Sequence, residues 1–380
     1  MMNRYITLTI SLTAILLCLA APSEAAREKS AEQRINKLST RVEALAEKLA
    51  ERNGPLGWIE DISVGGLLET EAAYARYEPA DNRQPDEKSS DIVLSTIEIG
   101  LDTRINEHVS GHVLFLWEED DTETVAVDEG FISLSGGWKL RAYLEAGKIY
   151  VPFGQCDSYF ISDPLTLELG ETRESALLAG WQAGGFDLAA GAFNGEVDEI
   201  NADDHIDSYF ASASYTLPET VSRGATVQMG VSYINNIAES DMLEAENDVN
   251  KDGSADGIED AAAGISGYIA ADFKKRLFFL AEYTGATDEL AAGEMAFASH
   301  SVKPRAWNTE LAYVFANDFG LGLRYEGTED GGTLLPETRY GAIAFCQPFA
   351  GGYLGVECLQ EEFGNRDQNI AVTAQLAYEF

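Results

Sequence analysis

Two stretches of this chain carry side chains that could bind ions or polar solutes. The first, residues 248–259, matches the calcium-loop pattern D-x-[DN]-x-[DN]-G-x5-E in full. Calcium prefers carboxylate and carbonyl oxygens, and Gly253 would allow the sharp turn that gathers them around one ion. The residues that would supply oxygens are Asp248, Asn250, Asp252, Ser254 (through its carbonyl) and Glu259. We expect a structural calcium ion here, or else a solvated acidic loop, because no helical pattern flanks the stretch.

The second stretch, residues 150–178, combines large apolar side chains with several carboxylates. Such a segment is too apolar for a loop surrounded by water. We therefore expect it to fold into a barrel, bury these side chains against the wall and narrow the channel; packing outside as a cap or subunit contact is the alternative. Charged rings at a constriction select ions and small solutes. The residues expected at this constriction are Asp157, Asp163, Glu168, Glu171 and Arg173, with Arg141 on the facing wall.

Histidine and nucleophile patterns give little support for catalysis. The sequence contains neither G-x-S-x-G nor H-E-x-x-H, and it has four histidines. His108 and His112 would share one face of a strand, about two strand repeats apart, which is too far to hold one metal ion without help. We expect them to be pore-lining polar residues. The sequence therefore predicts no enzyme, and no cofactor beyond the candidate calcium ion.

The elements that must position these residues are indicated by alternating apolar and polar side chains. In the last stretch, residues 369–380, Ile370, Val372 and Ala374 begin an apolar row that continues to Phe380. A period of two places such a row on one face of a strand. The period continues from residue 58 onward and predicts about sixteen strands. The expected strands are 62–75, 92–104, 108–117, 124–134, 138–149, 176–182, 186–193, 207–217, 225–234, 265–273, 277–284, 305–315, 319–327, 339–345, 353–362 and 370–380.

The connections between these strands alternate in length. Short turns such as 105–107 and 274–276 alternate with long polar or Gly-rich loops such as 76–91 and 235–264. This segregation is typical of bacterial outer-membrane barrels, which contact the outer-membrane lipid directly. An even strand count lets the last strand pair with the first, so that no edge is left open. The predicted fold class is all-β: a transmembrane antiparallel barrel of about 16 strands over residues 58–380.

The N-terminal residues predict export and a short helix. Arg4, an apolar run and small residues before Ala25 are typical of a signal peptide over residues 1–25. Residues 27–53 carry a heptad seam with apolar side chains at spacings of 3 and 4, which predicts a periplasmic coiled-coil helix. About three heptads are marginal alone, so the helix either forms a homo-oligomer through this seam or frays.

The amino-acid composition limits the kinds of molecule that this chain is expected to bind. The 380-residue chain has 26 Lys plus Arg against 64 Asp plus Glu, a formal net charge of −38. Because a phosphate backbone binds basic surfaces, this charge argues against nucleic acid. It fits a surface that meets cations, or a halophilic habitat. Outside the signal peptide the cysteines are Cys156, Cys346 and Cys358, and the odd count, with Cys346 and Cys358 out of register in their hairpin, predicts free thiols.

Five segments together resemble one known family. They are residues 147–154 (GKIYVPFG), 163–172 (DPLTLELGET), 303–313 (KPRAWNTELAY), 323–327 (LRYEG) and 372–380 (VTAQLAYEF). The chain from about residue 60 to the C-terminus resembles the LbtU-type siderophore porins. This resemblance implies a TonB-independent outer-membrane β-barrel for uptake of a ferric siderophore, with an N-terminal coiled-coil segment. It assigns no individual ligand residues, and the acidic insertion around residue 250 departs from the family pattern.

Two functions from the same class therefore compete, with a third from another class. The first is a porin-like channel for a ferric siderophore or a similar small solute, constricted by the segment 150–178. The second is a general diffusion porin, cation-selective because of the strong negative charge. A structural or adhesive surface barrel is the third, and it would need a plugged lumen and long protruding loops.

Overall fold

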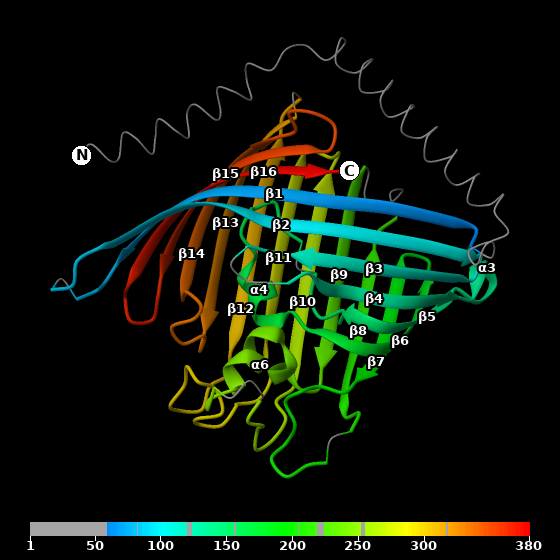
Figure 1. Cartoon of the computed structure of the whole chain (residues 1–380), viewed down its shortest axis with the longest axis horizontal. Coiled ribbons are helices and arrows are strands. Elements are labelled where there is room, and N and C mark those ends of the chain that lie inside the picture. Colours follow the sequence, from blue (N-terminus) through cyan, green and yellow to red (C-terminus); the bar gives the residue numbers. More distant parts are fainter. Residues whose placement is uncertain are drawn as a thin grey trace.

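The computed structural model describes residues 59–380, apart from residues 82, 120–123, 156, 204, 219–223, 252–254 and 317. This part of the chain forms one closed antiparallel β-barrel of sixteen strands (Figure 1). The all-β fold class and the expected strand number are confirmed. The expected signal peptide (1–25) and coiled-coil helix (27–53) lie outside the described residues.

Strands that follow one another in the sequence are hydrogen-bonded neighbours in the barrel. Among the described residues, four short helical elements accompany them, namely α3 (Gly137–Leu140), α4 (Leu165–Gly170), the 3-10 helix η1 (Ile237–Glu239) and α6 (Asp241–Asn247). The strands are β1 Asp61–Glu78, β2 Glu87–Asn106, β3 Val109–Trp117, β4 Ala126–Ser135, β5 Ala142–Tyr150, β6 Arg173–Ala183, β7 Phe186–Phe193, β8 Ser208–Thr216, β9 Ala225–Ile234, β10 Gly264–Phe273, β11 Leu277–Ala286, β12 Arg305–Val314, β13 Phe319–Glu329, β14 Thr338–Cys346, β15 Gly352–Glu362 and β16 Gln368–Glu379.

The barrel closes between its first and last strands, as the even strand count predicts. The register of β1 and β16 runs from Leu67 opposite Glu379 to Glu78 opposite Gln368. Beyond it, the backbones of Gly66 and Phe380 exchange two hydrogen bonds of 3.0 Å. A Cβ on Gly66 would lie 2.5 Å from Cζ of the Phe380 ring and 2.9 Å from the Glu98 carbonyl, so a larger residue would force the ring and the neighbouring backbone to shift. The closed sheet leaves no unpaired edge.

The expected strand over residues 138–149 is wrong at its start, and β2 begins at Glu87 instead of residue 92. Residues 137–140 form the single turn α3, and β5 begins at Ala142 instead of residue 138. Gly137 and Arg141 have φ of 67° and 52°, in the left-handed region that ends an extended strand. The Gly136 amide then donates to the carbonyl of Ala142 at 2.7 Å and closes a tight turn.

Side chains alternate between the two faces of the wall. Leu311, Leu321 and Leu323 point outward and are 45–64 % exposed, whereas the inward-facing Glu310 and Glu326 are at most 1 % exposed. This is the reverse of a soluble protein, with apolar side chains outside and carboxylates within. Among the described residues, no helix is long and apolar enough to cross a membrane.

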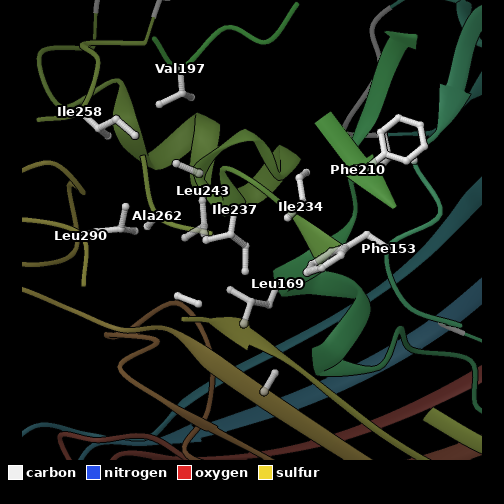
Figure 2. Packing of buried hydrophobic residues seen from close by; sticks show 14 of the residues in the cluster. Phe153, Leu169, Val197, Phe210, Ile234, Ile237, Leu243, Ile258, Ala262 and Leu290 are labelled. Atoms are coloured by element: carbon white, nitrogen blue, oxygen red, sulfur yellow. The ribbon is translucent and has the colours of Figure 1, made fainter. Parts of the chain in front are cut away.

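A continuous apolar core fills the long-loop end of the barrel on the side of β5 to β12. Wall residues such as Phe210 and Ile234 contribute to it, and so do loop residues such as Ile237 and Leu243 (Figure 2). Leu169 of α4, which is fully buried, points into the same cluster (Figure 2). The core therefore joins the loops to the segment that follows β5, and each fully buried Leu or Ile contributes about 1.5–3 kcal/mol.

The cysteines differ from the expectation of free thiols. Cys346 at the end of β14 is disulfide-bonded, so that expectation is wrong for this residue. Cys358 of β15 is a free thiol. Ala342 lies opposite Cys358 and Leu354 opposite Cys346, so the two cysteines are out of register, as expected. Their register excludes a disulfide between these two cysteines, but Cys346 can still bond to a cysteine elsewhere in the chain.

We predict that Cys156 is the partner of Cys346. The chain has four cysteines, of which Cys18 lies in the expected signal peptide and Cys358 is free. Peptide mapping of the purified protein without reductant should therefore yield one cross-linked peptide containing residues 156 and 346. Separate alkylated peptides for these two cysteines would contradict the prediction.

Candidate acidic channel site

The segment between β5 and β6 folds into the lumen, and the alternative of packing outside the barrel is wrong. This infolded segment comprises residues 151–172, since residues 173–178 belong to β6. Its helix α4 contacts β11, β12 and β13, on the far side of the barrel from β5 (Figure 1). The apolar residues Leu165 and Leu169 are fully buried and join the apolar core. Burial of these side chains draws the segment inward, as the sequence predicts.

Carboxylates of the wall hold the backbone of the infolded segment. Glutamates on four strands accept hydrogen bonds from its amide groups, which would otherwise be unpaired in a partly buried chain. Charge-assisted bonds of this kind are about twice as strong as neutral ones. The donors and acceptors are Gln155 to Glu282 (2.6 Å), Tyr159 to Glu310 (3.1 Å), Ile161 and Ser162 to Glu357 (2.9 and 3.3 Å) and Leu165 to Glu326 (2.7 Å).

Arg324 of β13 is the central cation of this attachment. Its side chain is fully buried and forms ion pairs with Glu310 at 2.9 Å and Glu326 at 3.5 Å. Its Nη1 donates to Oγ of Ser162 at 3.0 Å and its Nη2 to the Ser162 carbonyl at 3.0 Å. The guanidinium also lies 4.3 Å from the ring centre of Phe160. Arg324 therefore joins two wall carboxylates to the infolded segment.

Arg339 of β14 repeats this arrangement one strand further. Its Nη1 donates to the carbonyl of Asp163 at 3.0 Å, and its Nε donates to Glu361 at 2.8 Å. Glu326 lies 3.4 Å from the same guanidinium. Wall carboxylates and backbone carbonyls of the infolded segment thus compensate the charge of both wall arginines. These arginines add little net positive charge to the open lumen.

The infolded segment presents an acidic edge to the lumen. Asp163, Glu168 and Glu171 form this acidic edge, and the first two side chains are exposed. Although these side chains meet water in the lumen, the surrounding barrel wall partly desolvates Glu168 and raises its pKa, and the nearby charge of Asp163 raises it further. The same desolvation raises the pKa of Asp163, which Arg324 and Arg339 partly offset. The structure therefore brings together three of the predicted constriction residues.

Carboxylates of the wall face this acidic edge. The charge of Asp163 acts on Glu69 of β1, and that of Asp128 of β4 acts on Glu171. Glu361 of β15 acts on Glu168. Asp128 and Glu361 are nearly buried and paired with Arg173 and Arg339, so Glu69 is the one of these three that adds to the negative charge of the acidic edge.

Arg173 connects the base of the infolded segment to the wall and to a long loop. Its guanidinium is hydrogen-bonded to Asp128, lies 3.6 Å from Asp241 and sits 5.9 Å from the ring centre of Tyr150. The Arg173 amide also donates to Asp241 at 3.0 Å. The predicted site residue Arg173 is therefore at the site, but its charge is balanced by two carboxylates.

Two predicted site residues lie apart from this cluster. Arg141 is exposed in the short turn before β5, at the opposite end of that strand from the infolded segment. Arg141 has a left-handed backbone and ends α3, so it is not part of a strand. The alternation that would turn its side chain inward therefore does not extend to it. Asp157 belongs to the infolded segment but is exposed and accepts a hydrogen bond from Gln155 at 2.5 Å. The structure does not bring Arg141 to the acidic edge.

The alternation of the strands does not identify the wall carboxylates that hold the segment. Glu282, Glu326 and Glu357 each stand at an inward position of an alternating strand. An inward carboxylate on consecutive strands was a signal that the sequence contained. Their partners could not be read, because each bond joins residues more than 100 positions apart, such as Gln155 and Glu282.

The raised pKa of Glu171 leads us to expect that ion selectivity depends on pH near neutrality. Burial first, and the charge of Asp241 second, raises its pKa to about 7. A raised carboxyl pKa means that the negative charge is present above pH 7 and lost below it. We expect the preference for cations in bilayer recordings to fall as the pH drops from about 8 to about 6. Glu171→Gln should remove most of this step; an unchanged step in the variant would contradict the assignment.

The candidate calcium loop is only partly described. Asn250 hydrogen-bonds through its backbone and side-chain amides to Asp256, and the Glu259 amide donates to Glu294. Asp252 and Ser254 lie outside the described residues, while Asp248 follows α6. Asn247 closes the loop, since its Oδ1 accepts from the Gly257 amide at 2.9 Å. In the part of the chain that the structure describes, no group of three His, Cys, Asp or Glu side chains could hold a metal ion.

Calcium binding by residues 248–259 therefore stays a prediction. The Asn250 side chain would have to release Asp256 for its oxygen to turn toward an ion. Calorimetric titration of the purified protein should show binding heat at millimolar or lower calcium, which Asp248→Asn abolishes. Absence of heat up to millimolar calcium would contradict it.

Comparison with known proteins supports the fold and leaves the family open. No protein-family model matches the chain. The chain is 26% identical over 298 residues to a UPF0422 protein of Coxiella burnetii, which covers 75% of this chain and 61% of the relative. A UPF0422 protein of Legionella pneumophila strain Lens is 22% identical over 273 residues, covering 66% of this chain and 50% of the relative. The chain thus spans 50–61% of the length of these curated relatives.

Solved structures of porins share the fold. The outer membrane channel DcaP of Acinetobacter baumannii superposes with a TM-score of 0.56 at 13% identity, covering 84% of this chain and 97% of that protein. An anion-selective porin from Comamonas acidovorans gives 0.57 at 10% identity, covering 84% and 99%. OmpF of Salmonella typhi, in complex with daunomycin, gives 0.55 at 12% identity, covering 84% and 97%. The chain therefore has the fold of outer-membrane porins.

Proposed function

We propose that this chain is a passive outer-membrane channel that admits cationic and small neutral solutes in preference to anions. The observation that carries the proposal is the acidic edge of Asp163, Glu168 and Glu171, together with Glu69 of the wall, on which the charge of Asp163 acts. A ring of carboxylates at a narrow part of a pore attracts cations and repels anions. A porin described as anion-selective shares this fold. This does not contradict a preference for cations here, because selectivity depends on the side chains in the lumen and not on the fold.

The ion pairs in the lumen support the same sign of selectivity. Arg324, Arg339 and Arg173 are each paired with carboxylates, and the first two are nearly buried. A paired and buried guanidinium exerts little attraction on an anion in the lumen, since its charge is already compensated. The carboxylates of the acidic edge, by contrast, face water. The resulting potential favours cations.

Solute uptake into proteoliposomes tests this proposal. We expect arginine to enter liposomes that contain the folded protein several-fold faster than glutamate, which has a similar size and the opposite net charge. Liposomes that contain heat-unfolded protein are the control and should admit neither. Equal rates, or faster entry of glutamate, would overturn the proposed selectivity.

Uptake of a ferric siderophore is the second candidate. Residues 163–172, one of the segments in the resemblance to LbtU-type siderophore porins, form α4 and the acidic edge. The acidic lumen would favour neutral or cationic iron complexes over anionic ones. A deletion strain should then grow more slowly than its parent under iron limitation when supplied with its siderophore. Unchanged growth, alongside an open conductance of the purified protein, would reject this candidate and leave the general channel.

Self-association is a separate proposal that rests on the sequence. The heptad seam of residues 27–53 would join several copies through a coiled coil in the periplasm. Chemical cross-linking of the full chain should then give oligomers that a chain lacking residues 27–53 does not form. Equal cross-linking of both chains would reject the coiled coil as the cause.

A further inference from the structure

A cavity lies beside the infolded segment, on the side of β5 to β10. It has a volume of about 260 Å³ and is enclosed by the inner faces of β5 to β10 and by Pro152 and Gly154 of the infolded segment. We call it the tyrosine cavity. Pockets for drug-sized ligands measure roughly 300–1,000 Å³, so this cavity suits a smaller molecule. Its polar lining consists of Tyr143, Glu145, Tyr150, Asp187, Ser212, Ser214, Ser232 and Tyr268.

Two tyrosine rings lie against the wall of this cavity because glycines stand opposite them. Tyr143 pairs with Gly180 across β5 and β6, and a Cβ on Gly180 would lie 2.1 Å from Cζ of that tyrosine. Tyr268 pairs with Gly230 across β9 and β10, and a Cβ on Gly230 would lie 2.4 Å from its Cε1. Each glycine thus lets a ring cover the backbone of the neighbouring strand. The interior stays open as a result.

Hydrogen bonds fix the ends of both rings. The Tyr143 hydroxyl donates to Oδ1 of Asp187 at 3.1 Å. Nε2 of Gln228 donates to the Tyr268 hydroxyl at 3.0 Å. The Gly154 amide donates to Oγ of Ser232 at 3.0 Å and fastens the infolded segment at the edge of the cavity. The lining is therefore held in place without a ligand, which lowers the cost of binding one.

The charge of the cavity selects the class of ligand. Glu145 and Asp187 both line the cavity, and neither forms an ion pair with another of the described residues. Asp187 also accepts a hydrogen bond of 2.8 Å from Nε2 of Gln182, a neutral donor that leaves its charge in place. The described lining contains no lysine or arginine. Two carboxylates that share a partly enclosed space repel each other, so a cation between them would relieve the repulsion. Tyrosine rings attract cations further through the negative face of the ring.

From this combination we propose that the tyrosine cavity is a binding site for a small organic cation that carries amino or guanidino groups. Glu145 and Asp187 accept its N–H groups, and the rings of Tyr143 and Tyr268 cover its carbon chain. The hydroxyls of Ser212 and Ser214 supply further acceptors. The inference rests on the proposed cation channel and gives it a solute class: the acidic edge admits cations, and the cavity retains those with an organic body.

Agmatine is a suitable probe, because it carries a guanidinium and an ammonium at the ends of a short carbon chain. In planar bilayers with the full-length protein, agmatine should reduce the current in a saturable way, and calorimetry in detergent should show one site. A neutral diol and a dicarboxylate of similar length should have no such effect. Equal block by the diol would overturn the assignment to cations.

The double variant Glu145→Gln/Asp187→Asn should weaken agmatine about tenfold or more, since hydrogen bonds to charged groups are lost. Glu71→Gln on β1 removes a lumen carboxylate outside the cavity and is the matched control, expected to bind agmatine like the wild type. Heat-modifiable gel mobility checks that each variant is folded. If the double variant fails to fold, Gly230→Ala provides a second test, because its Cβ would push the Tyr268 ring into the cavity and weaken agmatine without removing a charge.

The results separate this inference from the proposed function. A wild-type channel that prefers cations but binds agmatine equally well in folded Glu145→Gln/Asp187→Asn, or in folded Gly230→Ala, would reject the tyrosine cavity alone. A channel with no cation preference would reject the proposed function, whatever agmatine does. Agmatine binding that falls in the cavity variants and persists in Glu71→Gln is the result that supports the site.

Discussion

Arg324→Met should detach the infolded segment from the wall, raise the single-channel conductance several-fold and lower thermal stability. The substitution leaves Glu310 buried without its cation and Glu326 with Arg339 alone, and breaking a buried pair costs about 3–5 kcal/mol. It also removes the bonds to Ser162 that hold the segment. Bilayer recordings would measure the conductance, and heat-modifiable gel mobility would measure stability.

Arg305→Met is the matched control for this prediction. Arg305 pairs with Glu329 at 3.0 Å on the same two-strand unit, but both side chains are at least 36% exposed. An exposed pair contributes roughly 0–1 kcal/mol, so this variant should keep the conductance of the wild type. If Arg324→Met folds with unchanged conductance, the segment is not held by Arg324 as described.

Asp163→Asn/Glu168→Gln should reduce the permeability of potassium relative to chloride about tenfold. Each carboxylate attracts a monovalent cation passing at about 6 Å by about 0.7 kcal/mol in a water-filled channel, and two such terms amount to about 1.4 kcal/mol. The fold should be unaffected, because Asp163 binds Arg339 through its carbonyl rather than its carboxylate. The effect should shrink at high salt, where charges are screened.

Glu107→Gln tests whether any lost carboxylate has this effect. Glu107 lies in the short turn between β2 and β3 and does not belong to the infolded segment. Its side chain is 85% exposed and contacts bulk water. Its selectivity should equal that of the wild type. A similar loss in Glu107→Gln and in Asp163→Asn/Glu168→Gln would mean that total charge, and not the acidic edge, governs selectivity.

The architecture could be predicted from the sequence because it depends on local patterns. Alternation with a period of two locates the strands, and the segregated loop lengths indicate an up-and-down barrel, which the closed register of β1 with β16 confirms. The apolar content of residues 150–178 also predicted the inward fold correctly. In each case, residues that are close together in the sequence show which side chains must be buried.

The candidate site could be predicted only in part, because its contacts join distant residues. The acids of residues 163–171 were recognised, but strand parity misplaced Arg141, whose backbone is left-handed and ends a helical turn. Parity also gave no means of pairing Glu326 with the Leu165 amide. The tyrosine cavity depends on register, since Tyr143 must lie opposite Gly180, and a shift of one residue would replace that glycine.

The reversal potential of the wild-type channel in a potassium chloride gradient tests the central claim most directly. The acidic edge and Glu69 of the wall predict a potential whose sign shows that potassium crosses more readily than chloride, at pH 8 and low salt. A potential near zero, or one of the sign given by chloride permeation, would contradict an acidic channel.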